Sequence, residues 1–176
     1  MRGVIEITDL SAIRSAWERV FHSNDPFSWP FQPEFAAGRI FFPTDGYHLT
    51  KQQFLAFADA LMQAGENELF ISVVESEGLS FLERSWGHWA CASLSYEDYV
   101  QLPLTLENAI YSREGRWGIL ISHEMHALIG GSAGFMAALD DQYRRWSDDL
   151  RLLREAWAEN PNASWLEPTI SHAIPV

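Results

Sequence analysis

The histidines best placed for metal chemistry are His123 and His126, with Glu124 between them. In the spacing H-E-x-x-H the two imidazoles share one face of a helix, but here one intervening residue is missing. The apolar run before His123 predicts a strand, on which the two side chains point to opposite faces. A shared metal ion would need a bend and a third ligand. We therefore expect solvated turn residues or a polar partner contact, with a metal-dependent hydrolase as the alternative.

Ser132 lies in the segment Gly130-Gly131-Ser132-Ala133-Gly134, which fits the nucleophile pattern G-x-S-x-G between a strand and a helix. Asp140 or Asp141, and then His172, follow in the order that a serine hydrolase needs. Against this, the preceding strand is expected to be antiparallel, no glycine-rich oxyanion loop lies upstream, and both acids sit on the same helix. A serine that caps a helix after a tight glycine turn explains the same residues, and a small hydrolase using Ser132 is the alternative.

The one cysteine, Cys91, lies in the apolar segment Trp89-Ala90-Cys91-Ala92. A thiol in such a strand is usually inert packing, which disfavours a nucleophile assisted by His88. No spacing among the carboxylates matches a calcium loop. We expect no bound metal ion and no cofactor.

Acidic residues dominate the middle of the chain. Between Gln52 and Ser112 there are nine acidic residues and one basic residue, Arg84, an excess that accounts for most of the net charge of -12. Because self-repulsion adds nothing to fold stability, a one-signed face indicates solubility or the sign of a partner. Tyrosines beside the adjacent acids Glu97 and Asp98 offer aromatic anchors. The residues that we expect to contact a basic protein partner are Glu75, Glu77, Glu83, Tyr96, Glu97, Asp98, Tyr99 and Glu107.

The composition is that of a globular chain, with 47% hydrophobic residues, and the 176 residues suit one domain spanning 1–176. No apolar run approaches the roughly 20 residues that cross a bilayer, and Glu6 interrupts the N-terminal segment, so neither a membrane span nor a secretory signal is expected. A lone cysteine favours a reducing cytoplasm. The sequence pI of about 4.8 disfavours nucleic-acid binding, which requires clustered basic residues.

Local patterns predict the elements that must position these residues. Apolar residues at helical spacing predict a helix over 10–21, with Thr8 or Asp9 as N-cap. A second helix begins at the capping-box pair of Thr50 and Gln53 and ends at Gly65. Short β-branched or aromatic runs bounded by turn residues then predict an antiparallel meander of strands over 69–74, 88–94, 106–111, 117–122 and 127–129.

Beyond Ser132, apolar residues step by three and four along one stripe from Phe135 to Trp157. This pattern predicts one long C-terminal helix that buries Trp146 and Leu150 against the sheet, followed by a tail over 160–176. We expect an α+β fold in which an antiparallel sheet of about five strands, within residues 69–131, carries flanking helices.

Prolines and aromatic residues crowd residues 25–47, where their density prevents a regular helix. The aromatic side chains are then either buried by a loop that wraps the domain or exposed as a partner surface. We favour the wrapping loop.

One stretch of the chain resembles a pattern in small bacterial proteins, some of which accompany secreted or contact-delivered toxins as immunity proteins. It includes Asn108-Ala109-Ile110-Tyr111-Ser112, Trp117-Gly118, Ser122-x-Glu124-x-His126-Ala127 and Gly130-Gly131. The resemblance implies a cytoplasmic inhibitor that masks a toxin enzyme, often a basic nuclease. It carries over no catalytic residues, because that class acts by binding. An acidic domain that neutralises a basic toxin by stoichiometric binding is the function we expect.

Overall fold

The protein is built around one antiparallel sheet with seven strands in the residues that the structure describes. The computed structural model describes residues 3–35, 38–74 and 80–173. The strand order is β1-β4-β3-β5-β6-β7-β2, and all neighbouring strands are antiparallel. The strands are β1 (Val4–Glu6), β2 (Gly38–Phe41), β3 (Glu68–Val73), β4 (His88–Ala92), β5 (Asn108–Ser112), β6 (Trp117–Ile121) and β7 (Ala127–Gly131).

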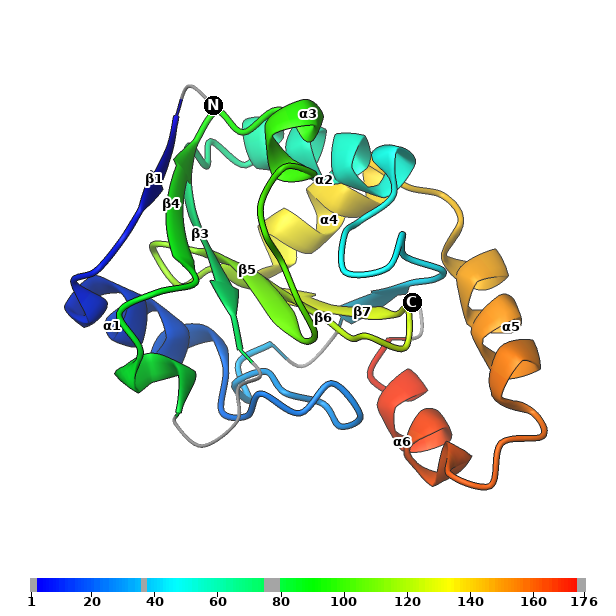
Figure 1. Cartoon of the computed structure of the whole chain (residues 1–176). Coiled ribbons are helices and arrows are strands. Elements are labelled where there is room, and N and C mark those ends of the chain that lie inside the picture. Colours follow the sequence, from blue (N-terminus) through cyan, green and yellow to red (C-terminus); the bar gives the residue numbers. More distant parts are fainter. Residues whose placement is uncertain (1–2, 36–37, 75–79, 174–176) are drawn as a thin grey trace.

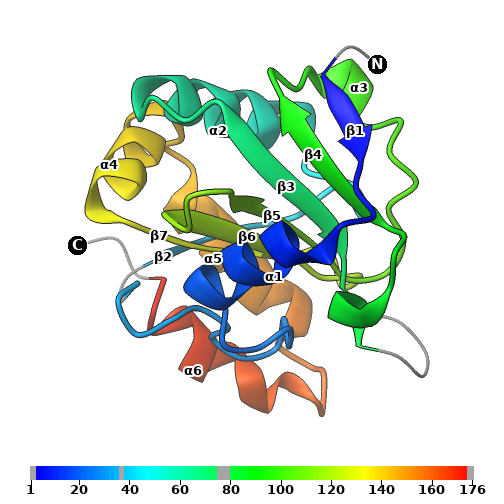
Figure 2. The same ribbon diagram turned by 90° about the vertical axis from the view of Figure 1, so that its left-hand side faces the viewer.

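Helices cover both faces of this sheet (Figures 1 and 2). Helices α2, α3 and α4 lie on one face, α1 and α6 lie on the other, and α5 packs beside the edge strand β2. In the described residues the helices are α1 (Leu10–Val20), α2 (Lys51–Gln63), α3 (Tyr96–Tyr99), α4 (Ala133–Gln142), α5 (Trp146–Trp157) and α6 (Leu166–Ile170). None of them is long and apolar enough to cross a membrane. The expected α+β class is confirmed.

The central strands are apolar on both faces, which explains why two layers of helices are needed. All five residues of β5, of β6 and of β7 are buried. The cross-strand row of Ile110, Ile119 and Ile129 faces α2, while Leu120 and Leu128 face α1 and α6. Burying each such side chain stabilises the fold by about 1.5–3 kcal/mol.

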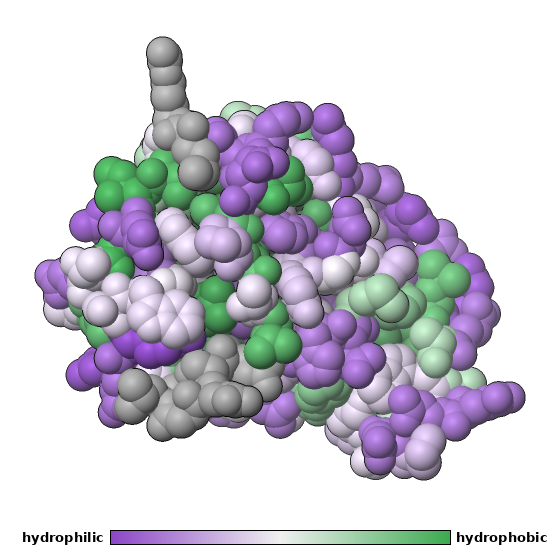
Figure 3. All heavy atoms as spheres, viewed as in Figure 1, coloured by the Kyte–Doolittle hydropathy of each residue, from purple (hydrophilic) through white to green (hydrophobic). Residues whose placement is uncertain are grey.

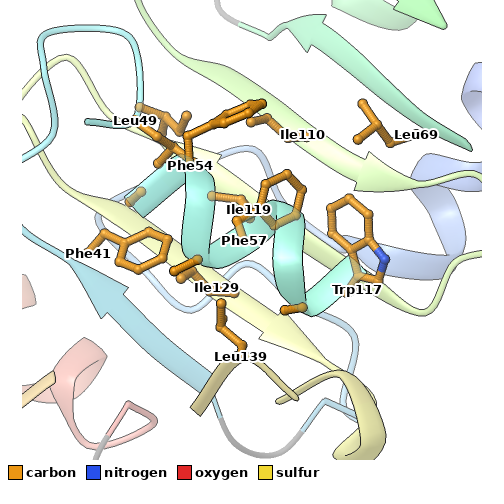
Figure 4. Close-up of a cluster of buried hydrophobic side chains, with 14 of the residues drawn as sticks. Phe41, Leu49, Phe54, Phe57, Leu69, Ile110, Trp117, Ile119, Ile129 and Leu139 are labelled. Atoms are coloured by element: carbon orange, nitrogen blue, oxygen red, sulfur yellow. The ribbon is translucent and has the colours of Figure 1, made fainter. Parts of the chain in front are cut away.

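Helix α2 supplies the main cover of the first face (Figure 4). The capping box predicted at Thr50 and Gln53 is present and fixes the start of the helix. From α2, Phe57 packs edge-on against Trp117, with ring centroids 5.1 Å apart, and Trp117 stacks on Phe135 of α4 at 5.2 Å. The first core thus joins α2 and α4 through one tryptophan of the sheet.

The second face is closed by α1 and by the aromatic segment that follows it. Trp17 of α1 stacks on Phe21 at 4.2 Å and meets Tyr111 of β5 edge-on at 5.6 Å. Phe31 and Phe35 are also buried in this second core. Burial of these side chains supports the wrapping-loop interpretation of residues 25–47, although residues 38–41 of that segment form strand β2 instead of loop.

The single long C-terminal helix that we predicted is wrong. The apolar stripe is divided between α4 and α5, and the last helix is short, consisting of α6 and the preceding 3-10 turn η2 (Ala163–Trp165). The chain breaks at Tyr143, whose hydroxyl donates a hydrogen bond to Asp149 Oδ2 at 2.7 Å. The Phe42 backbone N–H donates to the same oxygen at 3.2 Å, so α5 is tied to the end of β2.

Because α5 covers an edge, its apolar residues reach both sides of the sheet. Trp146 and Leu150 are both buried, as expected, but Trp146 belongs to the first core and Leu150 to the second. The five strands expected between residues 69 and 131 are confirmed as β3 to β7. The edge strands β1 and β2 were not predicted.

We predict that Trp146→Ala lowers the free energy of unfolding by about 3–5 kcal/mol, because it removes a buried indole that stacks on Phe41 at 5.1 Å. The matched control is Trp86→Ala, since Trp86 is 55% exposed and stacks on the Arg84 guanidinium. That control should cost at most about 1 kcal/mol. Urea denaturation measures both, and an unchanged midpoint for Trp146→Ala would contradict the packing of α5.

Candidate functional site

The acidic pair expected to contact a partner lies on the short helix α3. Ser95 caps this helix, because its Oγ accepts a hydrogen bond from the Asp98 backbone N–H at 3.1 Å. The Glu97 side chain is 74% exposed and meets Lys51 Nζ at 3.4 Å. Tyr96 is half-buried and packs against Phe54 of α2 at 5.6 Å. Three of the expected contact residues therefore lie together at the surface beside α2.

Two other expected contact residues are buried. Tyr99 is fully buried, stacks on Phe54 at 4.9 Å, and its hydroxyl accepts a hydrogen bond from the Leu49 backbone N–H. Glu107 accepts hydrogen bonds from the backbone N–H of His123 at 3.1 Å and lies 2.6 Å from His123 Nδ1. Tyr99 therefore belongs to the core, and Glu107 holds a turn.

The remaining expected contacts do not join α3. Glu83 is exposed on the 3-10 turn η1 (Phe81–Glu83), which packs against α1 on the second face. Glu75 and Glu77 lie outside the described residues. The expected contact residues therefore do not form one surface. Tyr96, Glu97 and Asp98 of α3 are the ones that lie next to a cavity.

An open groove of about 370 Å³ lies between α2, the start of β3 and the turn that follows β4. We call it the α2 groove. Its lining is mainly apolar, and sequence reasoning missed it because its walls come from separate parts of the chain. The lining residues are Phe54, Phe57, Ala58, Leu61, Met62, Glu66, Asn67, Glu68, Leu69, Ser93, Leu94 and Ser95.

Acidic side chains of the middle segment surround the α2 groove. Glu66 and Glu68 line it, and Glu97 and Asp98 lie two and three residues after the lining residue Ser95. The basic residues of this region are already engaged, because Arg116 pairs with Glu66, Arg113 with Glu68, and Lys51 with Glu97. Four acids against three bases leave the rim with one excess negative charge. Figure 3 shows mainly hydrophilic side chains, with smaller apolar areas between them, over α2 and α3 at the top of the view.

His123 and His126 lie in the tight turn between β6 and β7, not on a strand, and point to different surroundings. The imidazole of His123 is bound to Glu107 and also lies near Glu124, with Nε2 3.5 Å from Oε1. His126 is fully buried, its Nε2 lies 2.8 Å from the Pro26 carbonyl oxygen, and its ring stacks on Trp165 at 4.8 Å. No group of three potential metal ligands occurs among the described residues.

Ser132 occupies the position of a helix cap. Its Oγ accepts a hydrogen bond from the Phe135 backbone N–H at 3.4 Å at the start of α4. Asp140 is held by the guanidinium of Arg39, whose Nε donates to it at 2.9 Å, and His172 stacks on Trp29 at 4.9 Å. Strand β7 is antiparallel to both of its neighbours, as expected. The surroundings of Ser132 are therefore those of a cap.

A buried hydrogen-bonded chain of Ser72, His88 and Tyr111 was missed by sequence reasoning. Ser72 Oγ lies 2.8 Å from His88 Nδ1 and 2.8 Å from the Tyr111 hydroxyl, and all three residues are fully buried. Burial lowers the pKa of His88. Ser72 and His88 are direct cross-strand partners, so the chain ties β3, β4 and β5 together out of reach of a substrate.

Cys91 faces the first core, where burial raises the pKa of its thiol to about 12. A thiol with such a pKa stays protonated near neutral pH and is a weak nucleophile. Its expected role as inert packing agrees with this environment.

No protein-family model, curated protein or solved structure matches this chain.

We predict that stability falls as the pH drops from about 6.5 to about 4, through protonation of His126. Burial lowers the pKa of His126 from 6.5 to about 4, with the hydrogen bond to Pro26 opposing the shift. Between pH 6.5 and pH 4 the imidazole of His126 binds a proton in the unfolded chain but not in the folded chain. The folded state therefore has its full stability above pH 6.5 and loses stability as the pH falls. At about 1.36 kcal/mol per pKa unit, the loss is about 3 kcal/mol.

The measurement compares urea unfolding of the wild type and His126→Asn from pH 7 to pH 4. Because groups distant from His126 titrate alike in both proteins, the unfolding free energy of the wild type relative to that of His126→Asn should fall by about 3 kcal/mol over this range. A difference that stays constant with pH would show that His126 is not held neutral by burial.

Proposed function

We propose that this protein acts by stoichiometric binding of a basic protein, as an immunity protein that neutralises a toxin such as a basic nuclease. The observation that carries the proposal is the α2 groove with its negative rim, because apolar contact area and complementary charge are what protein recognition uses. The resemblance of residues 108–131 to immunity proteins points the same way. The lone cysteine suits a partner met in a reducing cytoplasm.

Binding accounts for the polar side chains better than catalysis does. A catalytic serine needs a base within hydrogen-bond reach and an oriented third group. Ser132 is instead engaged with the Phe135 N–H, and the acids proposed for a triad pair with Arg39 and Arg144. His123 and His126 are each held by separate partners, Glu107 and Pro26. The residues considered for a small hydrolase are therefore not arranged as a catalytic site.

We predict that Glu97→Lys with Asp98→Lys slows association with a basic toxin about tenfold at low salt, with a smaller change in dissociation. Complementary charge mainly steers encounter, and raising the ionic strength to 0.15 M shortens the Debye length to about 8 Å, which should slow the wild type as well. Surface plasmon resonance with a purified basic toxin domain measures both rates.

Glu34→Lys with Glu159→Lys is the matched control, since it makes the same change in net charge at exposed residues outside the groove and its rim. Glu97→Gln with Asp98→Asn tests the loss of charge without reversal. Equal association rates for the rim variant and its control would remove α3 from the interface. Covalent labelling of Ser132 by a fluorophosphonate would favour the hydrolase instead.

A further inference from the structure

We propose that the α2 groove anchors a large apolar side chain of a basic polypeptide segment, with flanking lysines or arginines placed on its acidic rim. This inference rests on the proposed function and adds the chemistry of the segment that the partner presents. The occupant is a peptide segment of the partner protein, not a small polar molecule.

The interior of the α2 groove suits an apolar side chain. Its volume of about 370 Å³ falls in the range of pockets that enclose ligands. Leu61 of α2 and Leu94 of the turn after β4 both line it, and Met62, also in the lining, is 71% exposed. Such a pocket gains free energy by removing both its own apolar surface and that of an entering side chain from water.

The polar groups of the groove leave little for a polar ligand to bind. Glu66 is buried, accepts a hydrogen bond from Ser112 at 3.3 Å and pairs with Arg116 at 3.1 Å, while Glu68 pairs with Arg113. Among the described residues, the buried polar side-chain atoms that lack a partner belong to residues outside the groove. Recognition inside the groove is therefore apolar.

Charge on the rim sets the sign of the flanking residues. Glu97 is paired with Lys51 at 3.4 Å, and both side chains are exposed. Exposed pairs of this kind contribute about 0–1 kcal/mol, so an arriving cation can replace Lys51 at little cost. A segment that carries an apolar side chain between basic residues matches both the interior and the rim.

The test uses two fluorescently labelled synthetic peptides, one with phenylalanine flanked by lysines and one with serine in place of the phenylalanine. The full-length protein is compared with Met62→Gln, with Leu55→Gln and with Ala58→Met. Leu55 is the matched control, because it is 48% exposed on the same helix but does not line the groove. Ala58→Met fills the groove from within, and thermal melts verify that every variant is folded.

By anisotropy, the phenylalanine peptide should bind wild type and Leu55→Gln alike, and Met62→Gln and Ala58→Met about tenfold more weakly. The serine peptide should not distinguish the four proteins.

Equal affinities for the two peptides, or an equal loss of affinity in Leu55→Gln, would overturn the groove as an anchor. If the two peptides bind with equal affinity, and both still weaken with salt and with Glu97→Lys and Asp98→Lys, the groove inference fails while binding of a basic partner stands. If the rate of association with a toxin is unchanged by Glu97→Lys and Asp98→Lys, the proposed function would instead be contradicted.

Discussion

The structure depends on a sheet whose central strands are apolar on both faces. Many antiparallel sheets expose one face to water and alternate polar with apolar residues. Here β5, β6 and β7 bury every residue, so the fold is stable only if helices cover both sides. The helices α2 and α4 meet this requirement on one face, and α1 and α6 on the other. The edge strand β2 is covered by α5, which the buried carboxylate of Asp149 fastens to Phe42.

The candidate site is where this cover is incomplete. Helix α2 packs closely against α4, and among the described elements its contacts with the short helix α3 are far fewer; the turn after β4 lines the groove opposite it. The gap between them is the α2 groove. The acidic residues Glu66, Glu68, Glu97 and Asp98 lie in its lining or within three residues of it. The other polar residues considered have structural roles. Ser72 belongs to a hydrogen-bonded chain that joins three strands, His126 is bound to the Pro26 carbonyl oxygen, and Ser132 caps α4. At the groove, apolar lining and an excess of acidic side chains occur together.

The elements with local signals could be predicted from the sequence, and those fixed by distant contacts could not. Helix α2 carries its own start in the capping box at Thr50 and its own stop at Gly65, which has a positive φ of 70°. The break between α4 and α5 has no local signal in the sequence, because Tyr143 and Trp146 continue the apolar spacing across it. The contact that holds α5 in place comes from Phe42, far away in the chain, which binds Asp149. Strand β2 is short and lies within a proline-rich segment. Tyr99 follows two acids but is buried by α2, so neighbouring charge did not indicate exposure. The groove needed the tertiary structure, since α2 and Leu94 are brought together only by the sheet.

The most direct test of the account is amide hydrogen exchange of the free protein and of its complex with a basic toxin. If the α2 groove and its acidic rim are the binding surface, exchange should slow in residues 58–69 and 93–99, which form the groove and α3. Protection confined to the opposite face, over α1 and α6, or to the turn between β6 and β7, would contradict the account.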